Sequence, residues 1–282
     1  MGLPLTFHAH DEQPLTSNQT ITLDIPKFGK IMSMQLAFLD GAGAEVTEAQ
    51  LRAEVGKIRL TIGGTDIINT SVSKLLDLQE VLKTKLGVNT GIDGVLDLLV
   101  ARHLYTDPDV AEIFGIGTMD INSIQIQVTA GTLVNVASVA SATWRSPVKE
   151  NMGTHLRFLD HVQNFNAIGE HSASNLPRDV KSDYLMVLTD DGTAGTITHG
   201  ECLVNGQSVF GKARASFIEQ HLSNMGYAMP SGYLIYNFSN GSLGGRIPML
   251  GTNDFVFKTT FSVAAGAAGY TMTALTAFNF NG

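Results

Sequence analysis

The chain has 282 residues, of which 44% are hydrophobic and only 16% are charged, and its formal net charge is −8. This acidic chain has no run of Lys or Arg, so direct binding to nucleic acid is disfavoured, because neutralising phosphates needs a basic surface. The single cysteine, Cys202, excludes a disulfide within the chain, and no stretch of about 18 apolar residues predicts a transmembrane helix.

Low charge and 29 glycines suit an all-β protein with many turns. Residues 1–19 are polar and have no pattern, and we expect an extended N-terminal arm there. The first half then contains stretches of alternating apolar and polar residues that predict strands. They lie at 21–26, 30–40, 57–69 (a hairpin with a central Gly-Gly turn), 123–130 and 133–145. Residues 94–105 fit a buried strand or a helix.

Three helices are expected among these strands, with a loop insertion as the alternative for the first of them, at 47–55. The segment 47–55 has Thr47 in position to cap it, and Gln50 completes a capping box. Leucines at mostly helical spacing predict a helix over 73–86. A capping residue, a first-turn proline and a closing glycine predict the third helix, at 106–115.

A polar break with Pro and Gly at 146–154 lies near the midpoint and marks the expected domain boundary. The chain would then consist of an arm at 1–19, an N-terminal domain at 20–148 and a C-terminal domain at 149–282. The second domain is expected to open with an irregular polar stretch at 151–180. Strands are then predicted at 183–192, 201–210, 232–238, 254–263 and 270–280, with a helix at about 213–225.

The two halves look like copies of one unit. A shift of 142 positions places residues 61–80 of the segment 61–82 on 203–222, and Gly64 then coincides with Gly206. Both segments predict a strand, a glycine turn, a second strand and a helix, and the turn needs a residue that accepts positive φ. Within the helix, the same shift places Leu75, Leu76 and Asp77 on Phe217, Ile218 and Glu219.

The upstream segments 35–43 and 185–195 also match, but at a shift of about 151. The first half therefore carries extra residues before its hairpin, and 47–55 has the right length to be that insertion. Strand, turn, strand and helix can also recur by chance in a β-rich protein. The interpretation we favour is a tandem duplication of one β-sandwich.

Two-copy β-proteins include double jelly-roll capsid proteins and bicupin metalloenzymes. A bicupin needs a His-x-His pair followed by a carboxylate, which His8, His10 and Glu12 could supply. That segment precedes the first predicted strand, and the second half has no such pair, so we interpret it as a solvated tail. Another alternative is a different virion surface β-protein, such as a spike, a penton or a glycan-binding module.

Five segments resemble the major capsid (coat) protein of corticovirus-type phages, which are tailless icosahedral bacteriophages with an internal membrane. They are KIRLTIGGTDIINTSVSKLLDLQEV (57–81), DPDVAEIFGIGTMDINSIQIQV (107–128), LPRDVKSDYLMVLTDDG (176–192), LVNGQSVFGKARASFIEQH (203–221) and GYLIYNF (232–238). The order of elements and the duplication carry this resemblance, which spans most of 20–280. The N-terminal arm and residues 239–251 depart from it.

The resemblance implies an all-β fold of two tandem jelly-roll β-sandwiches, a double jelly roll, with short helices inserted between strands. It implies a structural protein and no enzyme: a homotrimer that forms pseudo-hexagonal capsomers and tiles an icosahedral shell. Expected partners are neighbouring capsomers, minor capsid or penton proteins and virion membrane proteins, with no direct nucleic-acid binding. The protein would reside in the virion after synthesis in the cytoplasm of a bacterial host.

Few residues point to a chemical site. No pattern indicates a catalytic or cofactor-binding residue. Asp190 and Asp191 precede a glycine and fit a hairpin turn, and the alternative for them is a calcium site at an interface, because hard cations take clustered carboxylates. Cys202 coincides with Leu60 in the repeat, which predicts a buried strand residue.

Overall fold

The structure is a computed structural model that describes residues 5–9, 13–15, 18–27, 29–86, 94–98, 100, 115–118, 121–130, 136–144, 153–192, 195–239 and 245–279. The chain divides into two compact units. Unit 1 consists of Met1–Phe158 and Phe278–Gly282, and unit 2 consists of Leu159–Ala277. The chain thus passes into unit 2 shortly after the expected boundary at 146–154, and its last residues return to unit 1.

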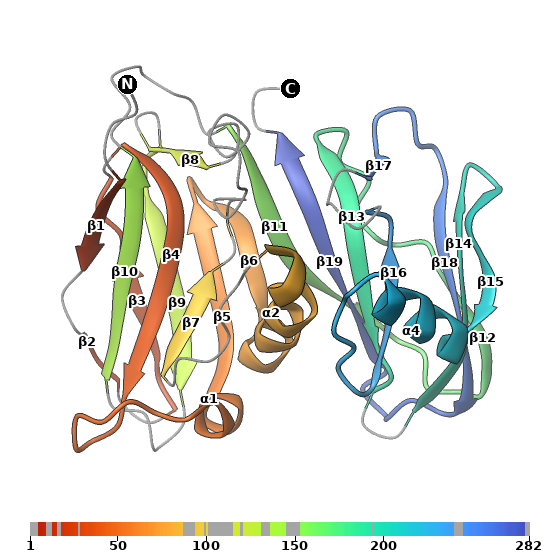
Figure 1. Ribbon diagram of the computed structural model, residues 1–282, viewed down its shortest axis with the longest axis horizontal. Coiled ribbons are helices and arrows are strands. Elements are labelled where there is room, and N and C mark those ends of the chain that lie inside the picture. The colour runs from red at the N-terminus through yellow and green to blue at the C-terminus, as the bar shows by residue number, and fades with distance from the viewer. Residues whose placement is uncertain are drawn as a thin grey trace. The chain divides into compact units, whose positions relative to one another are not determined.

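Unit 1 contains two sheets (Figure 1). The strands are β1 (Leu5–Ala9), β2 (Gln13–Pro14), β3 (Thr20–Asp24), β4 (Lys30–Leu39), β5 (Val55–Ile62), β6 (Thr65–Ser71), β7 (Val95–Leu98), β8 (Ile116–Gly117), β9 (Ile124–Ala130) and β10 (Val136–Trp144). One sheet has the order β1-β10-β4-β7, with β2 beside β10 and β8 beside β4. The other has the order β3-β9-β5-β6. The strand pairs within unit 1 are antiparallel, and buried and partly exposed residues alternate along β9, as its sequence pattern predicts.

Two helices of unit 1 lie against β5 and against each other (Figure 1). Helix α1 is Glu48–Glu54 and follows the predicted capping box: the Thr47 hydroxyl accepts from the Gln50 backbone N–H at 3.3 Å, and the Gln50 side chain accepts from the Thr47 N–H at 2.8 Å. Helix α2 is Val72–Leu86, which confirms the prediction over 73–86.

The described residues of unit 2 also form two sheets and one helix. Its elements are β11 (Thr154–Gln163), β12 (Gly169–Ala173), β13 (Ser182–Asp190), β14 (Thr196–Val204), β15 (Gln207–Arg214), α4 (Ala215–Asn224), β16 (Tyr233–Asn237), β17 (Ile247–Pro248), β18 (Phe255–Val263) and β19 (Tyr270–Asn279). The first residues of β11, up to Phe158, and the last residues of β19, from Phe278, belong to unit 1. The sheet orders are β11-β19-β13-β16, with β17 beside β13, and β12-β18-β14-β15.

The two units have the same topology. We name the eight main strands of each unit B to I in chain order: β1, β3, β4, β5, β6, β7, β9 and β10 in unit 1, and β11, β12, β13, β14, β15, β16, β18 and β19 in unit 2. Both units then have one sheet in the order B-I-D-G and one in the order C-H-E-F. Two four-stranded antiparallel sheets connected in this way form a jelly roll. The predicted double jelly roll, with helices inserted between strands, is confirmed.

The E–F hairpins match in detail. The turn residues Gly63 and Gly64 have φ of 56° and 82°, and Asn205 and Gly206 have φ of 50° and 76°, so both turns use two consecutive positive-φ residues. Each hairpin also has a β-bulge just after the turn, because the register skips one residue of strand F. The skipped residue is Ile67 in β6 and Val209 in β15, which are equivalent at the predicted shift of 142.

The predicted alignment of the two helices is wrong by one residue. Gly200 pairs with Ala213 and Cys202 with Phe210, so β15 contains a second irregularity that β6 does not have. The extra residue moves α4 to a shift of 143. The buried residues Ile218 and Leu222 then coincide with the buried Leu75 and Gln79 of α2, and Phe217 does not coincide with Leu75.

Two stretches that looked unstructured or irregular are strands. Residues 5–9 of the expected arm form β1, which pairs antiparallel with β10 along its whole length. The expected irregular stretch at 151–180 contains β11 and β12. Within 94–105, residues Val95–Leu98 form strand β7. The helix predicted at 106–115 lies outside the described residues except for Gly115.

Candidate functional site

Asp190 and Asp191 lie where β13 ends, and the Asp190 carboxylate and the Asp191 backbone both make structural hydrogen bonds there. Asp190 Oδ1 accepts hydrogen bonds from the backbone N–H groups of Gly192 and Thr271, both at 3.1 Å. The Asp191 N–H donates to the Gly232 carbonyl at 2.9 Å. Burial raises the pKa of Asp191, and the charge of the neighbouring Asp190 raises it further. These contacts tie the D–E turn to two neighbouring segments, and the calcium site stays a prediction.

A metal centre would need several donors close together. Within the described ranges no three His, Cys, Asp or Glu side chains are grouped so that they could hold a metal ion. Of the His-x-His segment, only His8 lies in a described residue range, as part of the backbone of β1, whereas His10 and Glu12 lie outside it.

Cys202 is the fully buried residue that the repeat predicts, since Leu60 is equally buried. Burial, together with a smaller contribution from the charge of the neighbouring Glu201, raises the pKa of its thiol to about 12. The side chain therefore stays protonated and inaccessible, which does not suit a nucleophile.

His155, the second residue of β11, is a buried side chain whose two ring nitrogens both lack a hydrogen-bond partner of sound geometry within the described structure. Its ring has no exposed surface. The ring packs at 5.3 Å from that of Phe278. Burial lowers its pKa to about 4, only partly opposed by the Gly153 backbone. By contrast, His171 in unit 2 has Nδ1 at 2.8 Å from the Tyr270 hydroxyl.

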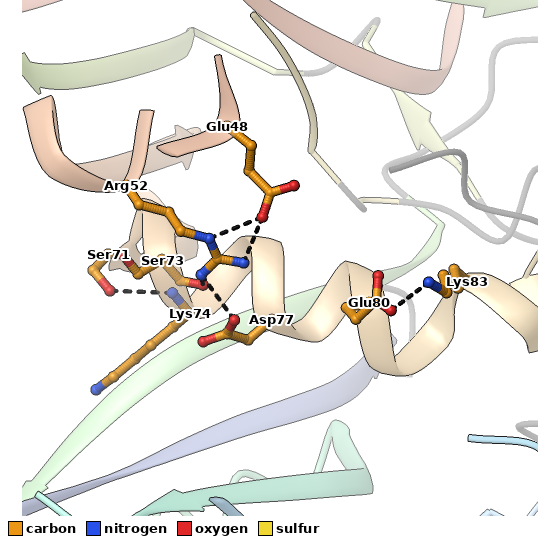
Figure 2. A network of polar contacts seen from close by, with 8 residues as sticks. All are labelled: Glu48, Arg52, Ser71, Ser73, Lys74, Asp77, Glu80 and Lys83. Carbon is orange, nitrogen blue, oxygen red and sulfur yellow. Dashed lines mark hydrogen bonds and ion pairs between the residues drawn. The ribbon is translucent and has the colours of Figure 1, made fainter. Parts of the chain in front are cut away.

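A polar network in unit 1 joins helices α1 and α2 (Figure 2). Arg52 of α1 donates to Asp77 Oδ1 of α2 at 2.8 Å and to the Ser73 carbonyl at 3.2 Å, and it pairs with Glu48 within its own helix at 2.9 Å. The Asp77 side chain is only 15% exposed. The network fixes α1 on α2, and Figure 2 shows the Glu80–Lys83 pair apart from it on the next turns of α2.

The outward faces of the two C-H-E-F sheets are polar and paired within the chain. In unit 1, Arg59 binds Asp66 at 2.8 Å, and Gln125 donates to Asp24 at 2.9 Å. In unit 2, the pairs across the sheet are Lys258–Glu201 at 3.1 Å and Lys212–Glu170 at 2.8 Å. Faces of this kind suit solvent, so contacts with other molecules are better sought at strand edges and loops.

Exposed apolar side chains distinguish the units. Among the side chains that the structure describes, all large hydrophobic residues with high exposure belong to unit 2. They are Val162, Ile168, Val180, Val209, Phe217, Leu250 and Val263. Single exposed apolar residues are common, but Val209 lies on the last strand of a sheet, where the backbone is also open to a partner.

The strand edges differ between the units in the same way. In the sheet order, the outer edge of β6 is next to β11, whose residues up to Phe158 belong to unit 1. Arg157 of that segment donates to the Asp66 carbonyl at 3.1 Å. The equivalent strand β15 is the last strand of its sheet, with no described strand beyond it. Sequence reasoning missed this difference, because pairing partners leave no mark on a strand's own pattern.

None of the described helices is long and apolar enough to cross a membrane. No protein-family model matches the chain, and a search of curated protein sequences finds no match. Solved structures, in contrast, match it over nearly its whole length.

Three of these structures represent different viruses. The major capsid protein P2 from bacteriophage PM2 has a TM-score of 0.76 and 13% identity, over 99% of this chain and 98% of that one. A chain of Sulfolobus Turreted Icosahedral Virus has a TM-score of 0.72 and 12% identity, over 98% and 91%. A chain of the PBCV-1 virus capsid has a TM-score of 0.64 and 10% identity, over 98% and 94%. At these identities the likeness establishes the shared fold.

Proposed function

We propose that this protein is the major capsid protein of an icosahedral virus and has no enzymatic role. The observation that carries the proposal is the match along the full length of both chains. The match covers 99% of this chain and 98% of the PM2 capsid protein, so it takes in both jelly rolls of this chain. The described residues also lack a grouped metal-binding set, and the thiol of Cys202 is buried.

The duplication supports a trimeric capsomer. Three chains with two jelly rolls each present six similar bodies around one axis, which gives a pseudo-hexagonal tile from a three-fold assembly. Few charges on the chain favour close contacts, because charged groups are costly to bury at interfaces. Neighbouring capsomers, minor capsid or penton proteins and virion membrane proteins are the proposed partners.

The proposed location is the virion, after synthesis in the cytoplasm of a bacterial host. Direct binding to the genome is not part of the proposal, since the net charge is −8. A shell protein of this charge would be repelled by phosphates and would need another component between itself and the genome.

Native mass measurement after size exclusion tests the proposal. A trimer should have three times the chain mass of 30.2 kDa, and electron microscopy of concentrated or co-expressed material should show pseudo-hexagonal tiles or closed shells. A protein that stays monomeric at every concentration and never forms tiles would contradict the proposed function. A stoichiometric transition metal in the purified protein would favour a metalloenzyme.

Calcium at Asp190 and Asp191 is a separate and smaller proposal. Binding would stabilise the folded state by mass action, so millimolar calcium should raise the melting temperature and a chelator should reverse the effect. Asp191→Asn should abolish the calcium response. If calcium and chelator leave the melting temperature of the native protein unchanged, these residues act only in the turn.

A further inference from the structure

One buried histidine of unit 1 lacks the hydrogen bonds that buried polar side chains usually make. The His155 side chain is fully buried, and neither ring nitrogen has a partner of sound geometry within the described residues. Most buried polar groups in native proteins are hydrogen-bonded, so such a ring needs an explanation. An apolar residue would fill the same place at lower cost, and what an imidazole adds is the ability to change its charge near neutral pH.

The side chain that His155 contacts belongs to the end of the chain. The Phe278 ring, near the end of β19, has its centroid 5.3 Å from that of His155. The guanidinium carbon of Arg157 lies 4.6 Å from the centre of the same Phe278 ring. All three residues belong to unit 1. Phe278 therefore contacts both an aromatic ring and a cation, and both contacts are attractive while the histidine is neutral.

The charges around His155 oppose a second positive charge there. Burial is the main cause that lowers the pKa of His155, and the positive charge of Arg157, on the same face of β11, lowers it further. β19 carries no charged residue. On β6, the Asp66 carboxylate is already bound by Arg59 and by the Asn69 side chain, each at 2.8 Å. A proton on His155 thus creates an imidazolium beside a guanidinium, and no carboxylate of the described residues offsets it.

The two sides of the contact are anchored unequally. The start of β11 is held by backbone hydrogen bonds, because the Leu156 N–H donates to the Val100 carbonyl at 2.9 Å and the Gly115 N–H donates to the Thr154 carbonyl at 3.3 Å. The other side of the contact is the end of a chain. Chain ends separate from the fold at lower cost than internal strands do. The end of β19 is therefore the side that can leave.

We propose that the neutral His155 ring anchors the end of β19 in unit 1 and that protonation of this ring releases it. Once Phe278 has left, water reaches the imidazolium and the cost of burying its charge disappears. The pKa of His155 is about 4 with the chain end in place and about 6.5 when the ring is in water, so the open form binds more protons between these values and gains population as the pH falls. This inference goes beyond the proposed function and does not depend on it.

Hydrogen exchange of the purified wild-type protein tests the anchor without any substitution. The two pKa values predict that the opening equilibrium of the chain end rises about 30-fold from about pH 7.5 to about pH 5. Mass spectrometry follows peptides from the end of β19, and the rates are corrected for the pH dependence of exchange itself. Dilute urea should leave this exchange unchanged, because a local opening exposes little surface, whereas exchange in β9 should accelerate.

Three variants assign the response to the contact. His155→Met fills the site with a flexible apolar side chain, and its chain end should respond to pH by less than about 3-fold. The matched control is His171→Gln, because His171 is a partly buried histidine of unit 2 that is bound to the Tyr270 hydroxyl, and the full response should remain. Phe278→Ala removes the ring that His155 contacts, so its chain end should already be open at about pH 7.5.

The outcomes separate a local anchor from a general effect of acid. A rise of about 30-fold in the wild-type protein that is absent from His155→Met supports the anchor. A chain end whose opening is the same at both pH values overturns it. A chain end that opens only together with β9 also overturns it, because acid then weakens the fold as a whole, and so does a full response in His155→Met. The native mass and the microscopy test the proposed function separately from all of these results.

Discussion

The two jelly rolls share one strand order but fill their cores with different side chains. Equivalent positions on strands E and H are Ile58, Leu60, Ile124 and Ile126 in unit 1, and Gly200, Cys202, Phe255 and Phe257 in unit 2. Unit 1 uses aliphatic residues on both strands, whereas unit 2 combines small residues on E with aromatic residues on H. The topology therefore depends on filling the space between the sheets and not on particular residues.

The aromatic residues of unit 2 form a connected cluster. The Tyr236 ring lies 4.9 Å from Phe257 and 5.3 Å from Phe210, and Phe255 lies 4.7 Å from Phe257. The buried Tyr236 hydroxyl is also satisfied, since it donates to the Lys258 carbonyl at 2.9 Å. Gly200 has no side chain, and this leaves the space that the Tyr236 ring and its hydroxyl occupy.

Giving Gly200 the side chain of its unit 1 counterpart should have the largest effect. A Cβ at this position would lie 2.6 Å from Leu234 Cδ2 and 2.9 Å from the Tyr236 hydroxyl. Gly200→Ile should therefore lower the free energy of unfolding by about 3 kcal/mol or more, measured by urea denaturation. The control is Gly211→Ala, where the nearest atom is 4.0 Å away, and the expected change is within about 0.5 kcal/mol. Equal stability of Gly200→Ile and wild type would mean that the two cores are interchangeable.

Acid should destabilise the protein through His155. Its pKa is about 4 in the folded state, below the unfolded value of about 6.5, so the unfolded chain binds more protons between these values. The stabilisation is present above about pH 6.5 and is lost as the pH falls towards 4. From about pH 7.5 to about pH 5 the loss should be about 2 kcal/mol. His155→Met should flatten this part of the urea-denaturation profile, and an unchanged slope would show that other groups control it.

Breaking the link between α1 and α2 should have a smaller effect. Arg52→Met leaves the mostly buried Asp77 carboxylate without its guanidinium partner, and the free energy of unfolding should fall by about 1–2 kcal/mol. Lys83→Met removes an exposed pair on the same helix and should cost about 0–0.5 kcal/mol. Similar losses for both variants would argue that α1 is not held by Arg52. Unit 2 offers a natural contrast, because α4 has no side-chain cap hydrogen bond.

The two E–F turns should respond differently to exchange of their first residue. The Asn205 side chain accepts from the backbone N–H groups of Asn253 at 2.8 Å and Asp254 at 3.1 Å, so Asn205→Gly should cost about 1 kcal/mol. Gly63 has open space around a Cβ, and Asn tolerates its φ of 56°, so Gly63→Asn should change stability by less than about 0.5 kcal/mol. Thermal melts of the two variants would show whether the turns are equivalent in energy as well as in shape.

Local patterns were sufficient for most elements of the fold. The alternation in 123–130, the capping box at Thr47 and Gln50, and the glycine turns were visible because each depends on residues close in the chain. The duplication followed from them, and with it the prediction that Cys202 is buried. The turn role of Asp190 was also readable, since its carboxylate binds the N–H of Gly192 two residues on.

Strands whose formation depends on pairing with a distant segment could not be predicted from the sequence. β1 and β12 lie at the edges of their sheets, and exposure of much of β12 removes the apolar alternation that would have marked it as a strand. The extra residue of β15, which moved α4 by one position, is defined only against β14.

The amino-acid sequence alone thus determined that the chain is all-β and duplicated, because hydrophobic alternation and positive-φ turns are local properties. Only the tertiary structure decided which strands end a sheet, how the same space is filled in two ways, and which edge stays open. Those properties arise from pairing and packing between residues far apart in the chain. The packing of the Phe278 ring against His155 is an example.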